Sequence, residues 1–327
     1  MRATILHTVT PDAPERDPVV GQIEQGLASQ GHEVSIVAVS NQVEPLVAAL
    51  VSAAPELVFN LAESFDGKSA LESSVTGLLN LLDLRYTGSS PAGLLIAGDK
   101  SLTKKVLTFH EILTPQFATV YRGALDSADD LAFPLIVKPP QEDASIGLTG
   151  ASVVHDLKQL LERMSALQSE FNGPVLLEQY IEGREFYVGV LGNTNAEALP
   201  IIELDFTGFP EGTPRIASWE AKWGTDGEGA GAEFAGTKSV FPESLDQELA
   251  TRMQRVAVEA FHALRLRDYA RIDLRVSPAG EIYVIEVNPN CYLERQSEFA
   301  SAAKKFGLEY EALIARIAEL ALARYSR

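Results

Sequence analysis

Three side chains that could hold a metal ion, with one arginine beside them, lie in two adjacent segments toward the C-terminal end of the chain. Arg271 and Asp273 belong to the first segment, and Glu286 and Asn288 belong to the second. Two carboxylates on one surface repel each other unless a cation lies between them. A hard divalent ion accepts carboxylate and amide oxygens and leaves positions for water and phosphate oxygens. These residues therefore predict a Mg²⁺ (or Mn²⁺) site that serves a phosphorylated ligand.

A β-hairpin is the element expected to position these side chains. Residues 277–280, Ser-Pro-Ala-Gly, separate two alternating segments and are typical of a tight turn. We expect Val276 to face Glu281 across this turn. In that register Asp273 and Glu286 are diagonal neighbours on one face, with Arg271 opposite Glu286. The other face would carry Ile272, Leu274, Val276, Tyr283, Ile285 and Val287. The same pattern also fits a solvated strand face with an Arg/Glu pair, so the hairpin alone leaves both interpretations open.

The composition is that of an ordinary globular enzyme. The chain has 327 residues, 46% of them hydrophobic and 22% charged, which is enough for a substantial core and two or three domains. A net charge of -18 argues against a nucleic-acid-binding surface. The single cysteine, Cys291, excludes an internal disulfide and fits a reducing compartment. No segment has the length and apolarity of a membrane span or of a signal peptide, so we expect a cytoplasmic protein.

Residues 1–97 alternate between strand and helix patterns. Strands are expected at 3–9, 34–39, 57–60 and 84–86, with helices starting near residues 18, 43 and 71. This alternation predicts a doubly wound parallel sheet whose ligands bind at the carboxyl ends of the strands. The loop at residues 60–67 lies at such an end and contains Glu63, a candidate for substrate recognition. A polar loop that caps a helix explains Glu63 equally well.

Two lysines in the middle of the chain are candidates for phosphate binding. Lys100 begins a helix that is expected to extend to residue 110, and Lys138 ends a buried strand at residues 133–139. A loop of small and acidic residues that contains Ser145 follows this strand. A lysine beside exposed backbone N–H groups suits a phosphate. A surface lysine with no ligand remains the alternative for each of them.

The segment at residues 177–185 joins two expected strands and can form an extended hinge. Such a hinge offers backbone groups and apolar side chains to an adenine ring, and Glu185 would lie near the ribose hydroxyls. Lys222 follows, between Trp219 and Trp223. The glycine-rich residues 224–236 after it are expected to form a flexible surface lid.

Together these segments resemble the ATP-grasp superfamily and, within it, enzymes such as D-alanine:D-alanine ligase. The matching segments are residues 58–60, 86–89, 99–104, 133–139, 144–147, 177–185, 220–222, 271–273 and 286–288. The resemblance covers nearly the whole chain. It implies an α/β fold with three lobes: an N-terminal doubly wound α/β domain (1–97), a central ATP-grasp subdomain (98–182) and a C-terminal ATP-grasp subdomain with the metal site (183–327).

The resemblance also implies roles for individual residues. Catalytic roles fall to Arg271, Lys222 and Lys138, with Arg271 steadying the acyl phosphate and the tetrahedral intermediate. The implied ATP ligands are Lys100, Lys138, Ser145, Glu178, Ile181, Glu185, Lys222 and Ile285. The implied metal ligands are Asp273, Glu286 and Asn288. The expected substrate-binding residues are Glu63, Arg271, Asn290 and Tyr292.

The implied activity is that of an ATP-dependent carboxylate–amine ligase. A carboxylate attacks the γ-phosphate of ATP, and an amine then attacks the acyl phosphate to give an amide, ADP and phosphate. The substrates would be small amino acids or compounds like them. No nucleic-acid or membrane partner is expected. The oligomeric state stays open, with a homodimer as one option because related ligases are often dimers.

The residues that depart from the family pattern are those expected to contact the amino-acid substrates. Residues 8–14 lack the family's glutamate, Glu63-Ser64 replaces its His-Gly, and residues 288–294 differ from the segment that receives the second substrate's carboxylate. We therefore expect a substrate pair other than two D-alanines. A true D-alanine:D-alanine (or D-alanine:D-lactate) ligase, a non-catalytic ATP-binding protein and a small-molecule kinase remain the alternatives.

Overall fold

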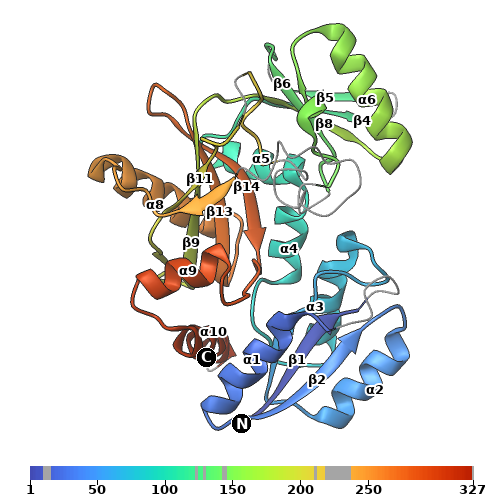
Figure 1. Ribbon diagram of the computed structural model, residues 1–327. Coiled ribbons are helices and arrows are strands. Elements are labelled where there is room, and N and C mark those ends of the chain that lie inside the picture. Colours follow the sequence, from blue (N-terminus) through green and yellow to red (C-terminus); the bar gives the residue numbers. More distant parts are fainter. Residues whose placement is uncertain are drawn as a thin grey trace.

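Three β-sheets and the helices around them make up the protein (Figure 1). The computed structural model describes residues 1–9, 16–121, 124–127, 130–141, 146–209, 212–217 and 237–325. Among these residues, no helix is long and apolar enough to cross a membrane.

The N-terminal sheet is parallel, as the strand–helix alternation predicted. Its strands are β1 (Arg2–Thr8), β2 (Glu33–Val39) and β3 (Leu57–Leu61), in the order β2-β1-β3. Ile5 faces α1 (Pro18–Ser29) and α10 (Tyr310–Tyr325), whereas Leu6 faces α2 (Val43–Ala53) and α3 (Glu72–Leu81). A single 3₁₀ turn, η1 (Ser69–Leu71), precedes α3. The strand expected at residues 84–86 forms only one parallel bridge, between Val58 and Tyr86.

The central sheet is antiparallel and has the order β5-β4-β8-β6-β7. Its strands are β4 (Phe117–Tyr121), β5 (Ala124–Ser127), β6 (Leu135–Lys138), β7 (Val153–Val154) and β8 (Val175–Gln179). α6 (Leu157–Phe171) covers one face, and η2 (Gly150–Ser152) leads into β7. β4 and β5 were not expected from the sequence.

The third sheet contains the predicted hairpin. Its strands are β9 (Arg184–Gly192), β10 (Glu197–Ala198), β11 (Ile202–Asp205), β12 (Lys238–Val240), β13 (Asp268–Val276) and β14 (Ile282–Pro289). Their order is β12-β11-β9-β13-β14, and β10 pairs with β9. The helices α4 (Pro91–Ala97), α5 (Lys100–Phe109) and α8 (Gln247–Ala263) bury one face, and α9 (Glu298–Lys305) packs on the other. α4 was not expected.

The hairpin has the predicted turn but a different register. Gly280 N donates to Ser277 O at 2.9 Å, which closes the turn. Val276 pairs with Ile282 rather than with Glu281. The expectation that Tyr283 and Ile285 belong to the core face is also wrong, since Ile282, Val284 and Val287 occupy it.

A β-bulge explains the rest of the difference. The register shifts between Asp273 and Leu274, so that Leu274 pairs with Val284 while Asp273 pairs directly with Glu286. Ile285 is the extra residue of β14 at this point, and a bulge of this kind re-aims the side chains beside it. Asp273 and Glu286 are therefore direct rather than diagonal neighbours.

Candidate active site

A cleft of about 750 Å³ lies between the central sheet and the sheet that contains the hairpin. Apolar side chains form much of its wall: Ile136, Ile146, Leu148, Ile181, Ile216 and Ile285. Charged side chains from five strands and one helix also line it: Lys100, Lys138, Glu178, Glu185, Asp273, Arg275 and Glu286. An apolar cleft with a few convergent polar groups is typical of a small-molecule site. Figure 1 shows β6 and β8 on one side of this region and β13 and β14 on the other.

Glu178, at the end of β8, is held between two lysines. Its Oε2 lies 3.0 Å from Lys104 Nζ and 3.0 Å from Lys138 Nζ. Burial lowers the pKa of Lys104 to about 8, and the Glu178 carboxylate opposes this effect. Burial acts to raise the pKa of Glu178, but the two lysines outweigh it and the pKa is lowered. Sequence reasoning had not assigned Lys104 a role, because only the tertiary structure brings α5 against β8.

Lys100, at the start of α5, contacts the metal-ligand candidate Glu286. The side chain of Asp99 caps α5 by accepting from Leu102 N at 3.0 Å, which makes Lys100 the first helical residue. Lys100 Nζ lies 3.0 Å from Glu286 Oε1, and Lys100 is buried. The structure thus brings a predicted phosphate ligand into contact with a predicted metal ligand.

Asp273 is the centre of the hydrogen bonds on the hairpin face. It accepts from Arg271 Nε at 2.7 Å, from Arg271 Nη2 at 2.9 Å and from Asn288 Nδ2 at 3.1 Å. The Arg271 guanidinium lies 4.5 Å from the centre of the Tyr187 ring and 3.6 Å from Glu298 Oε2. Burial opposes the charge of Arg271, but Asp273, Tyr187 and Glu298 outweigh it and raise its pKa. Arg271 is therefore a permanent cation paired with carboxylates of the protein.

The donor set on this face fits a metal ion that is shared with a phosphate ligand. Asp273 and Glu286 are paired residues of adjacent strands, and Asn288 reaches the same carboxylate. Two carboxylates and an amide oxygen suit Mg²⁺, whose remaining positions are filled by water and phosphate oxygens. Within the described part of the chain there is no group of three or more His, Cys, Asp or Glu side chains that could hold a metal.

Arg275 organises the end of the cleft next to the predicted hinge. Its Nη2 lies 2.7 Å from Glu185 Oε2, and its Nη1 donates to Ile181 O at 3.0 Å. Tyr187 OH donates to the other oxygen of Glu185 at 3.2 Å. Sequence reasoning missed Arg275, although alternation along β13 places it on the same face as Arg271 and Asp273.

Gly183 lets the hinge pass close to the hairpin. A Cβ at this position would lie 1.9 Å from Val276 O, and its φ is +142°, a conformation that L-residues rarely adopt. The connection from β8 to β9 therefore requires glycine here.

A second cavity, of about 520 Å³, lies where the N-terminal sheet meets the end of β14. It brings together three of the four predicted substrate residues, namely Glu63, Asn290 and Tyr292, whereas Arg271 does not line it. Asn290 Oδ1 accepts from Ser89 N at 2.8 Å, so this side chain also ties the wall of the cavity to the loop after Tyr86. Burial raises the pKa of Cys291 to about 12, which keeps the thiol protonated and unsuited to act as a nucleophile at neutral pH.

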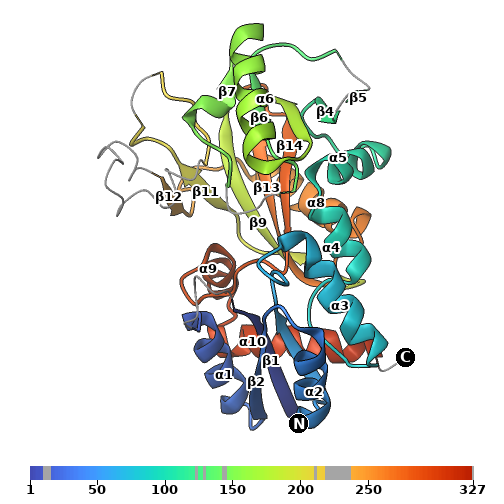
Figure 2. The same ribbon diagram turned by 90° about the vertical axis from the view of Figure 1, so that its right-hand side faces the viewer.

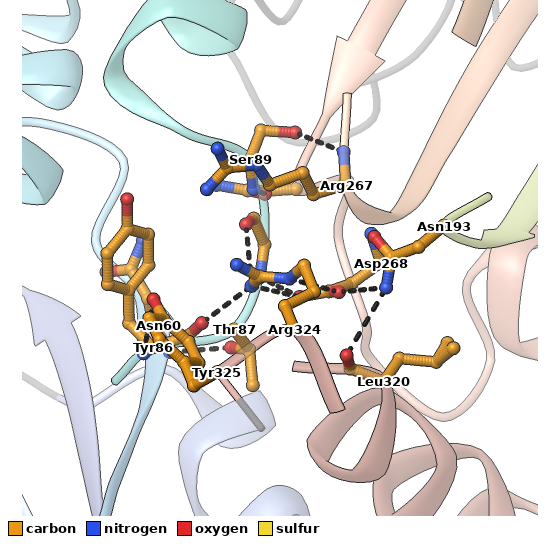
Figure 3. Close-up of polar contacts among 12 residues, drawn as sticks. Asn60, Tyr86, Thr87, Ser89, Asn193, Arg267, Asp268, Leu320, Arg324 and Tyr325 are labelled. Carbon is orange, nitrogen blue, oxygen red and sulfur yellow. Dashed lines mark hydrogen bonds and ion pairs between the residues drawn. The ribbon is translucent and has the colours of Figure 1, made fainter. Parts of the chain in front are cut away.

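Asp268 joins the same loop to β13 and α10 (Figure 3). Its carboxylate accepts from Gly88 N at 2.8 Å, from Asn193 Nδ2 at 2.9 Å and from Arg324 Nε and Nη2 at 3.0 and 2.8 Å. Arg324 Nη2 also donates to Tyr86 O at 2.8 Å. These contacts fix the N-terminal sheet relative to the hairpin, and with it the walls of the second cavity.

Two predicted site residues lie outside the described residues. Ser145 belongs to residues 142–145, and Lys222 belongs to residues 218–236 together with the predicted lid. Residues 10–15, most of the loop after β1, are outside the described ranges as well.

Comparisons with known proteins place the chain among amide-forming ligases. Residues 107–319 match the family described as the D-ala D-ala ligase C-terminus. The chain is 30% identical over 296 residues to the D-alanine:D-alanine ligase of Aquifex aeolicus, which covers 90% of this chain and 91% of that protein. It is 35% identical over 269 residues to an uncharacterized protein of Sinorhizobium fredii, covering 82% and 75%.

A solved structure has the same fold. The crystal structure of the D-alanine:D-alanine ligase from Bacillus anthracis complexed with ATP superposes with a TM-score of 0.75. The match covers 99% of this chain and 98% of that one, at 23% sequence identity. It confirms the ATP-grasp fold that the sequence predicted.

Proposed function

This chain belongs to the D-alanine:D-alanine ligase family of ATP-grasp enzymes, and on that basis we propose that it joins a small carboxylate to a small amine at the cost of ATP. The observation that carries the proposal is the convergence of Lys100, Lys138 and the pair Asp273/Glu286 on one cleft with an apolar wall. Cations and carboxylates there would meet the phosphates, and the apolar side chains would meet a base.

The reaction has two steps. A carboxylate oxygen attacks the γ-phosphorus of ATP, the bond to the β-phosphate oxygen breaks, and ADP leaves an acyl phosphate behind. The amine nitrogen then attacks the carbonyl carbon, phosphate leaves, and the nitrogen loses a proton. The products are an amide, ADP and phosphate.

Each described residue has a proposed part in these steps. Lys100 and Lys138 neutralise phosphate oxygens, and Arg271 steadies the acyl phosphate. Ile181, Ile285, Glu178 and Glu185 form the nucleotide end of the cleft, with Glu185 held in place by Arg275. Asp273, Glu286 and Asn288 would hold Mg²⁺ (or Mn²⁺), which supplies charge screening between the carboxylate and the phosphates. For Lys222 and Ser145 we retain the roles expected from the sequence.

Phosphate release tests the proposed function directly. The enzyme is incubated with ATP, Mg²⁺ and pools of L-amino acids, D-amino acids and small amino-bearing carboxylates, and active pools are examined by mass spectrometry. The expected result is ADP together with a product whose mass equals two substrates minus water. Tight ATP binding without turnover in every pool would instead support a non-catalytic ATP-binding protein, and a stable phosphorylated product would support a kinase.

A true D-alanine:D-alanine ligase is the second candidate, because relatives at 30–32% identity carry that name. D-alanine alone, and D-alanine with D-lactate, are the substrates that test it, with chiral analysis of the product. We also propose that the enzyme acts in the cytoplasm, as a homodimer. Light scattering of the purified protein tests its oligomeric state.

A further inference from the structure

His7 lines the second cavity, and one of its ring nitrogens has no hydrogen bond to any described residue. It lies near the end of β1, is 6% exposed, and lines the cavity. Its Nδ1 lies 3.2 Å from Thr8 O, and because a carbonyl only accepts, Nδ1 carries the proton. Burial lowers the pKa of His7, so the ring stays neutral at neutral pH. Its Nε2 is then an acceptor, and it makes no hydrogen bond with the residues that the structure describes.

Two carboxylates line the same cavity. Asp17 Oδ1 accepts from Val19 N at 2.8 Å and from Tyr292 OH at 2.9 Å, so the hydroxyl proton of Tyr292 points at Asp17. Burial and the nearby Asp17, Glu294 and Glu63 raise the pKa of Tyr292, which keeps this proton in place. Glu63 is the second carboxylate of the lining.

No lysine or arginine of the described segments lines this cavity. Arg16 is exposed, and Arg271 is engaged with Asp273 and lies 3.6 Å from Glu298 Oε2. Among the lining side chains a carboxylate would meet only like charge, whereas an ammonium group would meet the carboxylates of Asp17 and Glu63 and the Nε2 acceptor of His7.

We propose that this cavity binds the positively charged end of a basic amino acid, and that this amino acid is the carboxylate substrate of the ligase. The inference rests on the proposed function and names the substrate class of the same site. An α-ammonium group keeps its own carboxylate only two bonds away, which would bring that carboxylate near Asp17 and Glu63. A cation at the end of a side chain separates the two charges by several bonds.

The geometry of the chain supports this orientation. Asn290 and Tyr292 line the cavity, and Asn288 two residues earlier contacts Asp273 at the cleft. A substrate with its cation between Asp17 and Glu63 can therefore direct its carboxylate along this segment toward the phosphate end of the cleft.

Matched substrate pairs test the proposal. Lysine is compared with norleucine, and ornithine with norvaline, because each neutral partner has the same carbon chain without the terminal ammonium. Both enantiomers of each are supplied with ATP, Mg²⁺ and a pool of amines, and kcat/KM is measured from ADP formation with mass spectrometry of the product. We expect the basic member to exceed its neutral partner by at least about 30-fold.

Charge-neutralising variants provide the second arm. Asp17→Asn and Glu63→Gln keep the shape of each side chain, and together they should reduce the basic-to-neutral ratio to below about 3-fold. Glu170→Gln, an exposed position on α6 with no role in either cavity, should leave the ratio unchanged. Calorimetry of ornithine and norvaline with the wild type and the double variant measures the same preference without turnover.

The outcomes separate the two proposals. Two results would contradict the proposal that the cavity binds a cation, without contradicting the ligase activity. One is amide formation with neutral or acidic amino acids at equal or higher kcat/KM, and the other is a basic-to-neutral ratio that the double variant does not change. No ADP formation in any pool, with ornithine binding that the double variant abolishes, supports the cavity and contradicts the ligase. If calorimetry shows no preference for ornithine over norvaline, the proposal that the cavity binds a cation is wrong, with or without ligase activity.

Discussion

Arg324, in the last turn of α10, forms a two-point ion pair with Asp268, the first residue of β13, across a separation of 56 residues. The Asp268 side chain is 0% exposed and that of Arg324 is 14% exposed. Because the same guanidinium also donates to Tyr86 O, one residue links α10, the start of β13 and the loop that begins at Tyr86.

Removing this arginine should destabilise the protein. Arg324→Ala leaves the buried carboxylate of Asp268 with only its two amide donors, and breaking a buried ion pair from one side costs about 3 kcal/mol or more. Urea denaturation measures the free energy of unfolding. Arg316→Ala is the matched control, since Arg316 lies on the same helix in an exposed pair with Glu319 and should change stability by less than about 0.5 kcal/mol. Equal effects of the two variants would contradict the structural importance of Arg324.

Glu286→Gln tests the metal face of the hairpin. The change removes one of two paired carboxylates and the partner of Lys100, so turnover should fall by at least about 100-fold, with a higher Mg²⁺ requirement. ADP formation at several Mg²⁺ concentrations gives both quantities. Glu281→Gln, at the exposed turn of the same hairpin, should behave as the wild type. Near wild-type turnover of Glu286→Gln would refute the metal assignment.

Arg275→Lys tests the support behind Glu185. A lysine cannot reach both Glu185 and Ile181 O, because it lacks the planar fork of the guanidinium. We expect the Kd of ATP to rise by about 10- to 100-fold, measured by calorimetry. Arg252→Lys on α8 is the control, since Arg252 is exposed and makes one contact, to Gly280 O. Unchanged ATP affinity in Arg275→Lys would mean that Glu185 needs no such support.

The buried Lys104 should make stability rise with pH above neutrality. Its pKa is lowered from 10.5 to about 8 in the folded protein. Between these two values the unfolded chain binds more protons than the folded one, so stability from this group increases as the pH rises through that window. The unfolding free energy of the wild type minus that of Lys104→Met should therefore increase between about pH 7.5 and pH 10. Lys68→Met, at an exposed position, should show no such shift.

Cys291 should resist alkylation in the native protein. Burial raises its pKa to about 12, so at pH 8 only about one thiol in ten thousand is ionised. Reaction with iodoacetamide, followed by mass spectrometry, should be at least about 100-fold slower than in urea. Equal rates in the two conditions would show that the thiol is accessible.

Local sequence patterns were enough to predict the elements that carry the site. Strand–helix alternation gave the parallel N-terminal sheet, and the turn at residues 277–280 gave the hairpin. The ATP-grasp arrangement of the three lobes was predicted only from the family resemblance. The hydrophobic periodicity of the chain does not indicate it.

The exact register of the hairpin could not be predicted from the sequence. The spacing from Asp273 to Glu286 does not indicate a bulge. An isoleucine at position 285 fits a strand equally well whether its side chain faces the core or the cleft. β13 also pairs with β9, a long-range contact that local sequence does not show.

Tertiary contacts also decided what the charged residues do. Glu178 was expected at the adenine hinge, and the structure shows its carboxylate between Lys104 and Lys138. Those three residues come from α5, β6 and β8, so no local pattern could pair them. The prediction that the loop after β1 lacks a family glutamate covers residues 8–14, and Glu15 follows immediately, outside the described residues.

α10 packs on α1, but it is synthesised long after α1 and the first sheet. α1 and α10 lie side by side (Figures 1 and 2). A Cβ at Gly26 of α1 would be 3.4 Å from three atoms of Ile314 on α10. The first sheet is complete at Leu61, whereas α10, which packs on this face, begins only at Tyr310. Until α10 is synthesised, the apolar side of α1 and β1 is uncovered, and exposed apolar surface of this kind favours aggregation with other chains.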